Sequence, residues 1–333
     1  MIRQLLTACC LPAWTAAAFL SAGAATAAPV APAPPPAELH ILPVQGNIYM
    51  LVGAGGNITV QTGSDGVLLV DSGLAANSDK VLAAVRSLSD KPVHYIIDTH
   101  VHADHVGGNE AIAKSGTTIA GGNVVGDIGS SASNRATIIA FQTVADRMST
   151  PAAGAPAAPA GALPTDTYTT LERKIFFDNE GVEMIHVPAA HTDGDTMVFF
   201  RRSDVISTGD IFVTNGYPIV DLERGGNIQG VIAGLNRIIE LAIPADEQEG
   251  GTLIIPGHGR LCDVADVVFY QEMVTIIRDR VQALINKGMT LEQVKAAKPT
   301  RDYDPRYGST TGSWTPDKFV TAVYTSLRAG DSK

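Results

Sequence analysis

Short apolar runs separated by polar, glycine-containing turns dominate the hydrophobic pattern of this chain. Runs with the length and alternation typical of β-strands occur at residues 40–52, 57–62, 67–71, 93–97, 117–120, 183–188, 197–200, 204–207 and 252–255. Apolar residues with helical spacing occupy residues 78–89, 109–114, 225–242, 263–287 and 316–327, and residues 123–148 are mixed and partly helical. Strands that alternate with helices predict an α/β layer fold.

The densest group of metal-binding side chains follows the apolar run 93–97, in the sequence THVHADH at positions 99–105. His100 and His102 are two residues apart, so on an extended segment their side chains point the same way. Asp104 and His105 come just after the strand end, where a tight turn can direct them at a second point. Imidazole and carboxylate groups suit zinc and similar divalent metals, so the pattern indicates two metals side by side. The alternative is a solvated His-rich loop, but three of the eight histidines of the chain lie here, between an apolar strand and the sequence VGGN.

Three further apolar runs end in small, glycine-containing turns that each carry one metal-binding side chain. These side chains are His191, Asp210 and His258, which follow the runs 183–188, 204–207 and 252–255. Taken singly, a histidine at a strand end is more often structural than a ligand. Four such turns in this order favour a shared metal site.

The motifs together resemble those of the metallo-β-lactamase superfamily. The matching sequences are GVLLVDSG at 66–73, HVHADH at 100–105, AHTDGD at 190–195, TGD at 208–210 and PGHG at 256–259, so that the resemblance spans about residues 40–285. It implies a four-layer αβ/βα sandwich with the metals at the edge between two sheets.

The resemblance also implies a complete set of seven metal ligands. His100, His102 and His191 would hold the first metal, Asp104, His105 and His258 would hold the second, and Asp210 would bridge the two. The metals would be two Zn²⁺ ions, with iron or manganese as alternatives. The position of Asp71 in the family is supporting structure near the site, and we do not expect it to be a ligand.

The mechanism that follows is hydrolysis. A hydroxide shared by the two metals would attack a carbonyl, and Asp104 would be the catalytic residue that orients the nucleophile and passes a proton to the leaving group. Four polar residues of the ligand turns either fix the imidazole tautomers or only cap the turns, and both interpretations stay open. They are Thr99, Thr192, Asp193 and Asp195.

The N-terminus has the features of an export signal. A positive start and a region rich in Leu and Ala predict a signal peptide at residues 1–28, followed by a Pro/Ala-rich tether at 29–39. We therefore expect a periplasmic or secreted protein that is not stably inserted in a membrane after cleavage, with an uncleaved anchor as the alternative. Cleavage would leave Cys262 as a lone cysteine, which we interpret as a small buried residue.

The remaining sequence predicts a catalytic domain at 40–285, with a flexible Ala/Pro-rich loop at 151–164 that could border the cleft, and a C-terminal helical extension at 286–333. A formal net charge of −10 without a basic stripe argues against nucleic acid as a partner. We expect a small-molecule substrate, while the oligomeric state stays open.

The substrate is the least determined feature. β-Lactam hydrolysis is the leading hypothesis, although the positions directly after Asp210 are apolar (IFV at 211–213) and lack the lysine that grips the substrate in the first β-lactamase subclass. A lactonase or glyoxalase-type thioesterase is the alternative; an iron-dependent persulfide dioxygenase and a non-catalytic metal-binding protein rank lower. The candidate substrate contacts are the loop residues Asn57, Asn215, Tyr217 and Arg224, and a solvated or structural role is the alternative for each. The glycine-rich tip at 53–56 is a candidate flap over the cleft.

Overall fold

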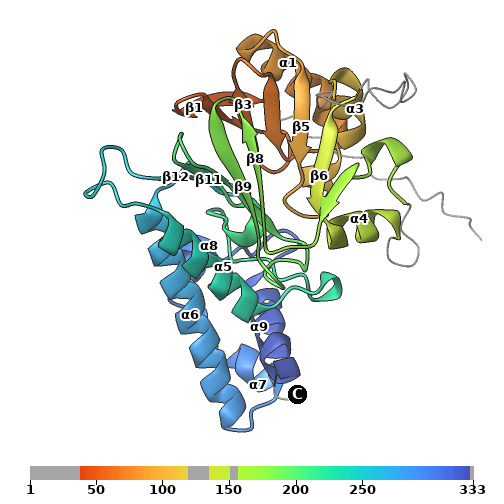
Figure 1. Cartoon of the computed structure of the whole chain (residues 1–333). Coiled ribbons are helices and arrows are strands. Elements are labelled where there is room, and N and C mark those ends of the chain that lie inside the picture. The colour runs from red at the N-terminus through yellow and green to blue at the C-terminus, as the bar shows by residue number, and fades with distance from the viewer. Residues whose placement is uncertain (1–37, 119–134, 151–156, 331–333) are drawn as a thin grey trace, which may run out of the picture. The chain divides into compact units, whose positions relative to one another are not determined.

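The structure is a computed structural model that describes residues 38–118, 135–150 and 157–330 (Figure 1). The predicted signal peptide, most of the predicted tether and residues 151–156 of the Ala/Pro-rich loop lie outside these ranges. None of the helices in the described ranges has the length and apolar character needed to span a membrane.

The first sheet has seven strands in chain order. They are β1 (His40–Gln45), β2 (Ile48–Val52), β3 (Ile58–Thr62), β4 (Val67–Val70), β5 (Val93–Ile97), β6 (Thr137–Phe141) and β7 (Asp166–Tyr168). The first four strands form an antiparallel meander, whereas β4 to β7 pair in parallel. The parallel connections run through the helices α1 (Ser78–Leu88), α2 (Ala103–Val106), α3 (Asn109–Ser115) and α4 (Gln142–Ser149).

The second sheet has five strands in the order β12-β11-β10-β9-β8. Their bounds are β8 (Glu172–Phe177), β9 (Glu180–His186), β10 (Thr196–Phe200), β11 (Val205–Ser207) and β12 (Leu253–Ile255). Because β10 is antiparallel to both β9 and β11, and β12 is parallel to β11, the strands β9, β11 and β12 all run in one direction. Their carboxyl ends therefore meet at one edge of the sheet.

Three apolar cores separate four layers. The inner core joins the two sheets, with Leu68 and Ile97 of the first sheet in the same cluster as Val198 and Phe200 of the second. A second core packs α1 and α3 on the outer face of the first sheet. A third packs α5 (Ile228–Leu241) and α6 (Val264–Asn286) on the outer face of the second sheet. This order of layers confirms the predicted four-layer αβ/βα sandwich.

The C-terminal helices pack against the third core (Figure 1). They are α7 (Leu291–Ala296), α8 (Asp304–Tyr307) and α9 (Pro316–Gly330). Phe319 and Val323 of α9 are fully buried in that core. The predicted helical extension therefore continues the layer formed by α5 and α6.

Several parts of the secondary structure differ from the sequence prediction. The strands β7 and β8 were not predicted. Residues 117 and 118 are not in a strand, and the rest of the expected strand at 117–120 lies outside the described residues. The stretch 123–148 contains the strand β6 before the helix α4, and its residues 123–134 are outside the described ranges. The apolar run of β6 is only five residues long, and periodicity alone does not separate such a run from a buried helical segment.

Candidate metal centre

The first four predicted ligands lie in one turn after β5, an interior strand of the first sheet. His100 and His102 follow the strand, and the single-turn helix α2 carries Asp104 and His105. The turn is tied to its surroundings by backbone bonds, since the amide of Asp71 donates to the carbonyl of Ile97 and the amide of Ser72 donates to that of His105. The local fold thus places four donors within six residues.

The other three predicted ligands lie at the carboxyl ends of β9, β11 and β12. Because these strands run in one direction, His191, Asp210 and His258 project from the same edge. The two edges are joined at this point, since the amide of Thr196 donates to the carbonyl of Thr99 at 2.8 Å and the amide of Asn57 donates to that of Gly257 at 2.8 Å.

The structure brings all seven predicted ligands together. Three groups have donor atoms that all lie within 4.8 Å of one another: His100, His102 and His191; His100, His105 and Asp210; and Asp104, His105 and His258. The first and third groups coincide with the two ligand sets that the resemblance implies. The second group places Asp210 between them, where a bridging carboxylate is expected.

Two buried atoms at the centre of this group test whether a metal fits. Nε2 of His100 and Oδ1 of Asp210 are buried and have no hydrogen-bond partner among the residues that the structure describes. Leaving buried polar atoms unpaired costs free energy, and a cation bound between them would remove that cost. Nδ1 of His102 lies 2.8 Å from Nε2 of His191, so two ring nitrogens face one point. The donor set therefore fits divalent metal ions.

The charge state of the buried side chains also suits metal binding. Burial lowers the pKa of His191 to about 4 and that of His100 well below its usual range, so both imidazoles are neutral at pH 7 and keep a free lone pair. Burial raises the pKa of Asp210, but the nearby His105 and His191 outweigh this effect and hold that pKa well below its usual range. Asp210 is therefore an anion in the middle of the donor set. Its carboxylate and that of Asp71 outweigh burial and raise the pKa of His105 well above its usual range, so that this imidazole would lose a proton on binding a metal.

The second nitrogen of each inner histidine is held by a neighbour. Nδ1 of His105 donates to Oδ2 of Asp71 at 2.7 Å, and Nδ1 of His191 donates to the carbonyl of Ile219 at 2.7 Å. These bonds direct Nε2 of both rings toward the site.

Thr99 links His100 to the same carboxylate. The Thr99 hydroxyl donates to Oδ2 of Asp71 at 2.8 Å and lies 3.0 Å from Nδ1 of His100, from which it accepts a hydrogen bond. Asp71 also accepts from the backbone amide of Thr99 at 2.8 Å. Asp71 is thus a supporting residue, as the resemblance implied, and Thr99 positions a ligand in addition to shaping the turn.

Asp221 is a supporting residue that the sequence analysis missed. Its Oδ2 accepts a hydrogen bond from Nε2 of His102 at 2.8 Å, which turns Nδ1 of that ring toward His191. Arg224, expected near the substrate, donates to the same carboxylate oxygen at 2.7 Å. Asp221 also caps the short 3-10 helix that begins at Leu222, and this capping pattern is the only signal in its local sequence.

Asp104 lies at the open edge of the site. Its side chain is 36% exposed, and its Oδ2 is 3.2 Å from Nε2 of His258. Burial alone would raise the pKa of Asp104, but the nearby His258 and His105 outweigh burial and lower this pKa below its usual value. The carboxyl group is therefore ionised at neutral pH. Since His102 and His258 are also partly exposed, a substrate would approach from this side.

Two of the expected substrate contacts have structural roles instead. Asn57 is buried, and its amide donates to the carbonyls of Pro256 and Gly259, so that it shapes the turn that carries His258. Tyr217 is also buried, and its hydroxyl donates to Oδ1 of Asp304 at 2.9 Å. Both polar groups are used within the fold, so the structure favours the alternative of a structural role for these two residues.

Asn215 is exposed, and its role as a substrate contact stays a prediction. The glycine-rich tip at 53–56 is not a free flap. Gly56 is buried, its amide donates to the carbonyl of Asp104, and a Cβ at this position would lie 2.3 Å from Cε1 of His105. The tip is a fixed wall of the site.

The remaining polar residues near the ligands mainly shape turns. The carboxylate of Asp195 accepts from the amide and the hydroxyl of Thr192, and Asp193 forms an ion pair with Arg147 at 2.5 Å. Cys262 is buried, and its thiol donates to the carbonyl of Arg260, which agrees with the predicted structural role.

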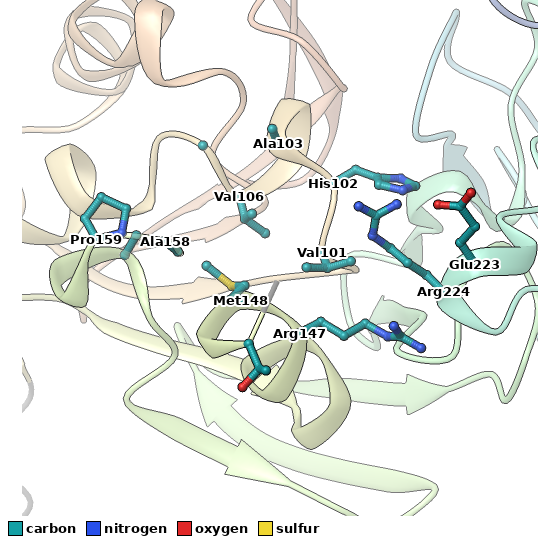
Figure 2. Close-up of a pocket in the computed structure, with 13 residues that line it drawn as sticks. Val101, His102, Ala103, Val106, Arg147, Met148, Ala158, Pro159, Glu223 and Arg224 are labelled. Atoms are coloured by element: carbon teal, nitrogen blue, oxygen red, sulfur yellow. The ribbon is translucent and has the colours of Figure 1, made fainter. Parts of the chain in front are cut away.

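A cavity of about 420 Å³ opens beside His102 (Figure 2). It is lined by residues of the ligand turn, of α4 and of the segment after residue 157, including Ala158, Pro159 and Ala162. The described part of the predicted Ala/Pro-rich loop therefore borders a cavity next to the donors, in agreement with its expected place at the cleft.

Comparison with known proteins gives a consistent result. A family model described as the metallo-β-lactamase superfamily matches residues 45–258. A linear primary-alkylsulfatase from Pseudomonas sp. is 26% identical over 274 residues, which cover 72% of this chain and 50% of that protein. This chain thus spans about half the length of that curated relative.

Solved structures share the fold at low identity. A stereoselective inverting sec-alkylsulfatase from Pseudomonas sp. matches with a TM-score of 0.62 and 15% identity, over 86% of this chain and 50% of the other. A metallo-β-lactamase from Pontibacter korlensis matches with a TM-score of 0.53 and 13% identity, over 72% of this chain and 99% of the other. The family model covers more than half of the chain and includes all seven donors. The chain belongs to the metallo-β-lactamase superfamily.

Proposed function

We propose that this chain is a hydrolase that holds two divalent metal ions, with zinc as the first metal to test and iron or manganese as alternatives. The observation that carries the proposal is the convergence of seven donors at one site. Two of the donor atoms, Nε2 of His100 and Oδ1 of Asp210, are buried and have no hydrogen-bond partner in the described part of the chain. The first metal would be held by His100, His102 and His191, and the second by Asp104, His105 and His258.

The metals would supply an activated water and polarise the bond to be cleaved. Asp104 is the side chain placed to handle the proton, because its carboxylate is ionised, partly exposed and at the open edge of the site. Asp210 contributes negative charge at the buried centre of the donor set, and Asp71 keeps Nε2 of His105 directed into the site.

The substrate in this proposal is a small ester or amide. β-Lactams are one class to test, because β-lactamase structures match this chain over nearly their whole length. Sulfate esters are the second class, favoured by the 26% identity with a linear primary-alkylsulfatase. Lactones and thioesters are two further classes to test, because a water activated by bound metal can attack any acyl carbon.

Export to the periplasm or medium is part of the proposal and rests on the apolar N-terminal segment at residues 1–28. Expression of the whole chain in a Gram-negative host, cell fractionation and intact mass measurement test it. We expect a periplasmic product that has lost about 28 residues. A full-length product in the cytosol or membrane fraction would contradict export.

The central experiment measures metal content and turnover on the same sample. The purified protein is analysed by elemental mass spectrometry and assayed with a chromogenic cephalosporin, a lactone, a thioester and an alkyl sulfate. We expect two metals per chain and cleavage of at least one substrate class. Bound metal without turnover of any class would favour a non-catalytic metal-binding protein, and iron with persulfide oxidation would favour the dioxygenase alternative.

Asp104→Asn separates catalysis from metal binding. The amide keeps one oxygen donor but accepts no proton, so we expect activity to fall at least a hundredfold while most of the metal remains. Asp90→Asn is the matched control, because Asp90 is exposed on the loop before β5. Full activity in Asp104→Asn would show that another group handles the proton.

A further inference from the structure

The cavity beside His102 has two unlike sides (Figure 2). One side is apolar, and its lining residues are Val101, Val106, Met148, Ala158, Pro159 and Ala162. The other side carries His102 together with the charged groups of Arg147, Glu223 and Arg224. A volume of about 420 Å³ lies within the range of small-molecule sites.

The charged side of the cavity is not a free anion site. Arg147 donates to both carboxylate oxygens of Asp193, at 2.8 and 2.5 Å. Arg224 donates to Asp221 at 2.7 Å. With Glu223 added, the carboxylates here outnumber the two guanidinium groups, so that a bound anion would gain no net positive field from these side chains. What the cavity offers a ligand is chiefly apolar surface.

The apolar side is built on a small core of its own. Val106, Met148 and Ala162 are buried members of a cluster that also contains Ala140 of β6 and Val144 of α4. Val101 and Ala158 pack against this cluster. Side chains anchored in a packed core form a preformed surface, so that a ligand need not order it on binding.

The position of the cavity relates this surface to the donors. Val101 lies between the ligands His100 and His102 in the chain, and Ala103 precedes Asp104. Figure 2 shows His102 on one side of the cavity, Val101, Val106 and Met148 in the middle, and Ala158 and Pro159 on the far side. A molecule cleaved at the open edge of the donor set could therefore extend away from it over apolar side chains.

We propose that this cavity binds a linear hydrocarbon arm of the substrate, which runs from His102 over Val101, Val106 and Met148 toward Ala158. The substrate class is thus an amphipathic ester or amide, with the bond to be cleaved at the donor set and an uncharged chain in the cavity. The substrate assignment rests on the proposed hydrolase function, whereas the binding of a hydrocarbon chain is measured without turnover.

The test uses the metal-loaded protein and the linear alcohols butanol, hexanol and octanol as probes. Each added methylene group that enters an apolar cavity strengthens binding about threefold to fourfold. We therefore expect the dissociation constant from calorimetric titration to fall by about tenfold for every two carbons. A dissociation constant that does not change with chain length would overturn the proposal.

Ala158→Phe is designed to fill the far end of the cavity from a half-buried position. This substitution should abolish the increase in affinity from hexanol to octanol. Ala158→Leu, a milder change, should reduce the same gain and covers the case in which the phenylalanine variant does not fold. Ala157→Phe is the matched control, because Ala157 is the exposed neighbour outside the lining. An equal chain-length gain in Ala158→Phe, Ala158→Leu and Ala157→Phe would overturn the proposal.

The same variants applied to a hydrolysable ester series distinguish this inference from the hydrolase function itself. If the esters are cleaved but the KM does not depend on chain length, the cavity assignment is wrong and the hydrolase function stands. If the alcohols bind with the expected dependence but no ester or amide is cleaved, the hydrolase function is wrong and the binding of hydrocarbon chains stands.

Discussion

The two halves of the donor set are built in different ways. The first sheet contributes four donors from one turn after β5, whereas the second sheet contributes His191, Asp210 and His258 from three separate turns. In the first half, polar side chains such as Asp71 hold the imidazoles in place. In the second half, backbone carbonyls and closely packed glycines do so. The donors of the first half are therefore positioned mainly by side-chain hydrogen bonds, and those of the second half mainly by close contacts with the backbone.

This difference predicts which substitutions damage each half. The first half should be most sensitive to the loss of a hydrogen-bonding carboxylate. The second half should respond to a single added methyl group.

The largest effect is expected for Asp71→Ala in the first half. The change removes the acceptor of three hydrogen bonds and leaves Thr99 and His105 with unpaired buried donors. We expect the free energy of unfolding to fall by about 3–5 kcal/mol and the metal affinity to fall by about tenfold to a hundredfold. Urea unfolding and competition with a chromophoric chelator measure the two effects.

The control for this prediction is Asp90→Ala, in which an exposed aspartate is removed near the same sheet. It should change stability by less than about 0.5 kcal/mol. If Asp71→Ala kept the affinity of the natural chain for metal, the supporting role of that carboxylate would be disproved.

The next largest effect is expected for Gly257→Ala in the second half. A Cβ at Gly257 would lie 2.0 Å from Oδ1 of Asp210 and 2.6 Å from the carbonyl carbon of Gly209, so that the backbone or the Asp210 side chain must move. Overpacking of this kind costs about 1–3 kcal/mol of stability. We also expect at least a tenfold loss of metal affinity, because a donor is displaced.

Gly216→Ala provides the matched control, since a Cβ there would meet its nearest atom, the carbonyl oxygen of Tyr307, at 3.8 Å. Metal affinity and stability should stay within error of the natural chain. Equal behaviour of the two alanine variants would mean that the second half is not held by close backbone approach.

The same difference explains which parts of the site the sequence could predict. The four donors of the first half are contiguous, so their spacing alone indicated two metals, whereas His191, Asp210 and His258 carried weight only in combination. The α/β layer fold followed from the alternation of strands and helices, whereas the four layers were implied by the resemblance to the superfamily.

The sequence did not predict hydrogen bonds between side chains that are far apart in the chain. Asp221 lies 119 residues from His102, and its local sequence indicates only a helix cap. Asn57 and Tyr217 were assigned to substrate because loop polarity does not reveal that a side chain is buried and already paired. Burial of a polar group and its distant partner are properties of the packed fold.

A smaller effect is expected for Asp221→Ala, which tests the less buried edge of the first half. The change frees Nε2 of His102, but the Asp221 side chain is 13% exposed and water can replace part of the bond. We expect about a tenfold loss of metal affinity and little change in stability. Glu223→Gln is the control, because Glu223 is two residues away and lines the cavity without bonding His102. An unchanged affinity in Asp221→Ala would leave His102 positioned by packing alone.

The smallest effect concerns His186, at the end of β9 in the second half and outside the donor set. Its ring stacks on Phe141 with centroids 3.5 Å apart, and Nδ1 donates to the carbonyl of Asp195. Burial lowers the pKa of this imidazole below its usual value near 6.5. The unfolded chain therefore binds the proton more readily, and the stability that neutral His186 contributes is lost as the pH falls below about 6.5.

His186→Phe removes this titration while keeping an aromatic ring against Phe141. Urea unfolding in the presence of a chelator, at pH 7.5 and at pH 5.5, should show a smaller loss of stability on acidification for the variant than for the natural chain. Because the variant retains all seven donors, the difference isolates His186 from the titration of the ligand histidines. If both proteins lost the same stability, the pH sensitivity of the second half would come from its donors alone, and β9 would act only as a rigid support for the turn that carries His191.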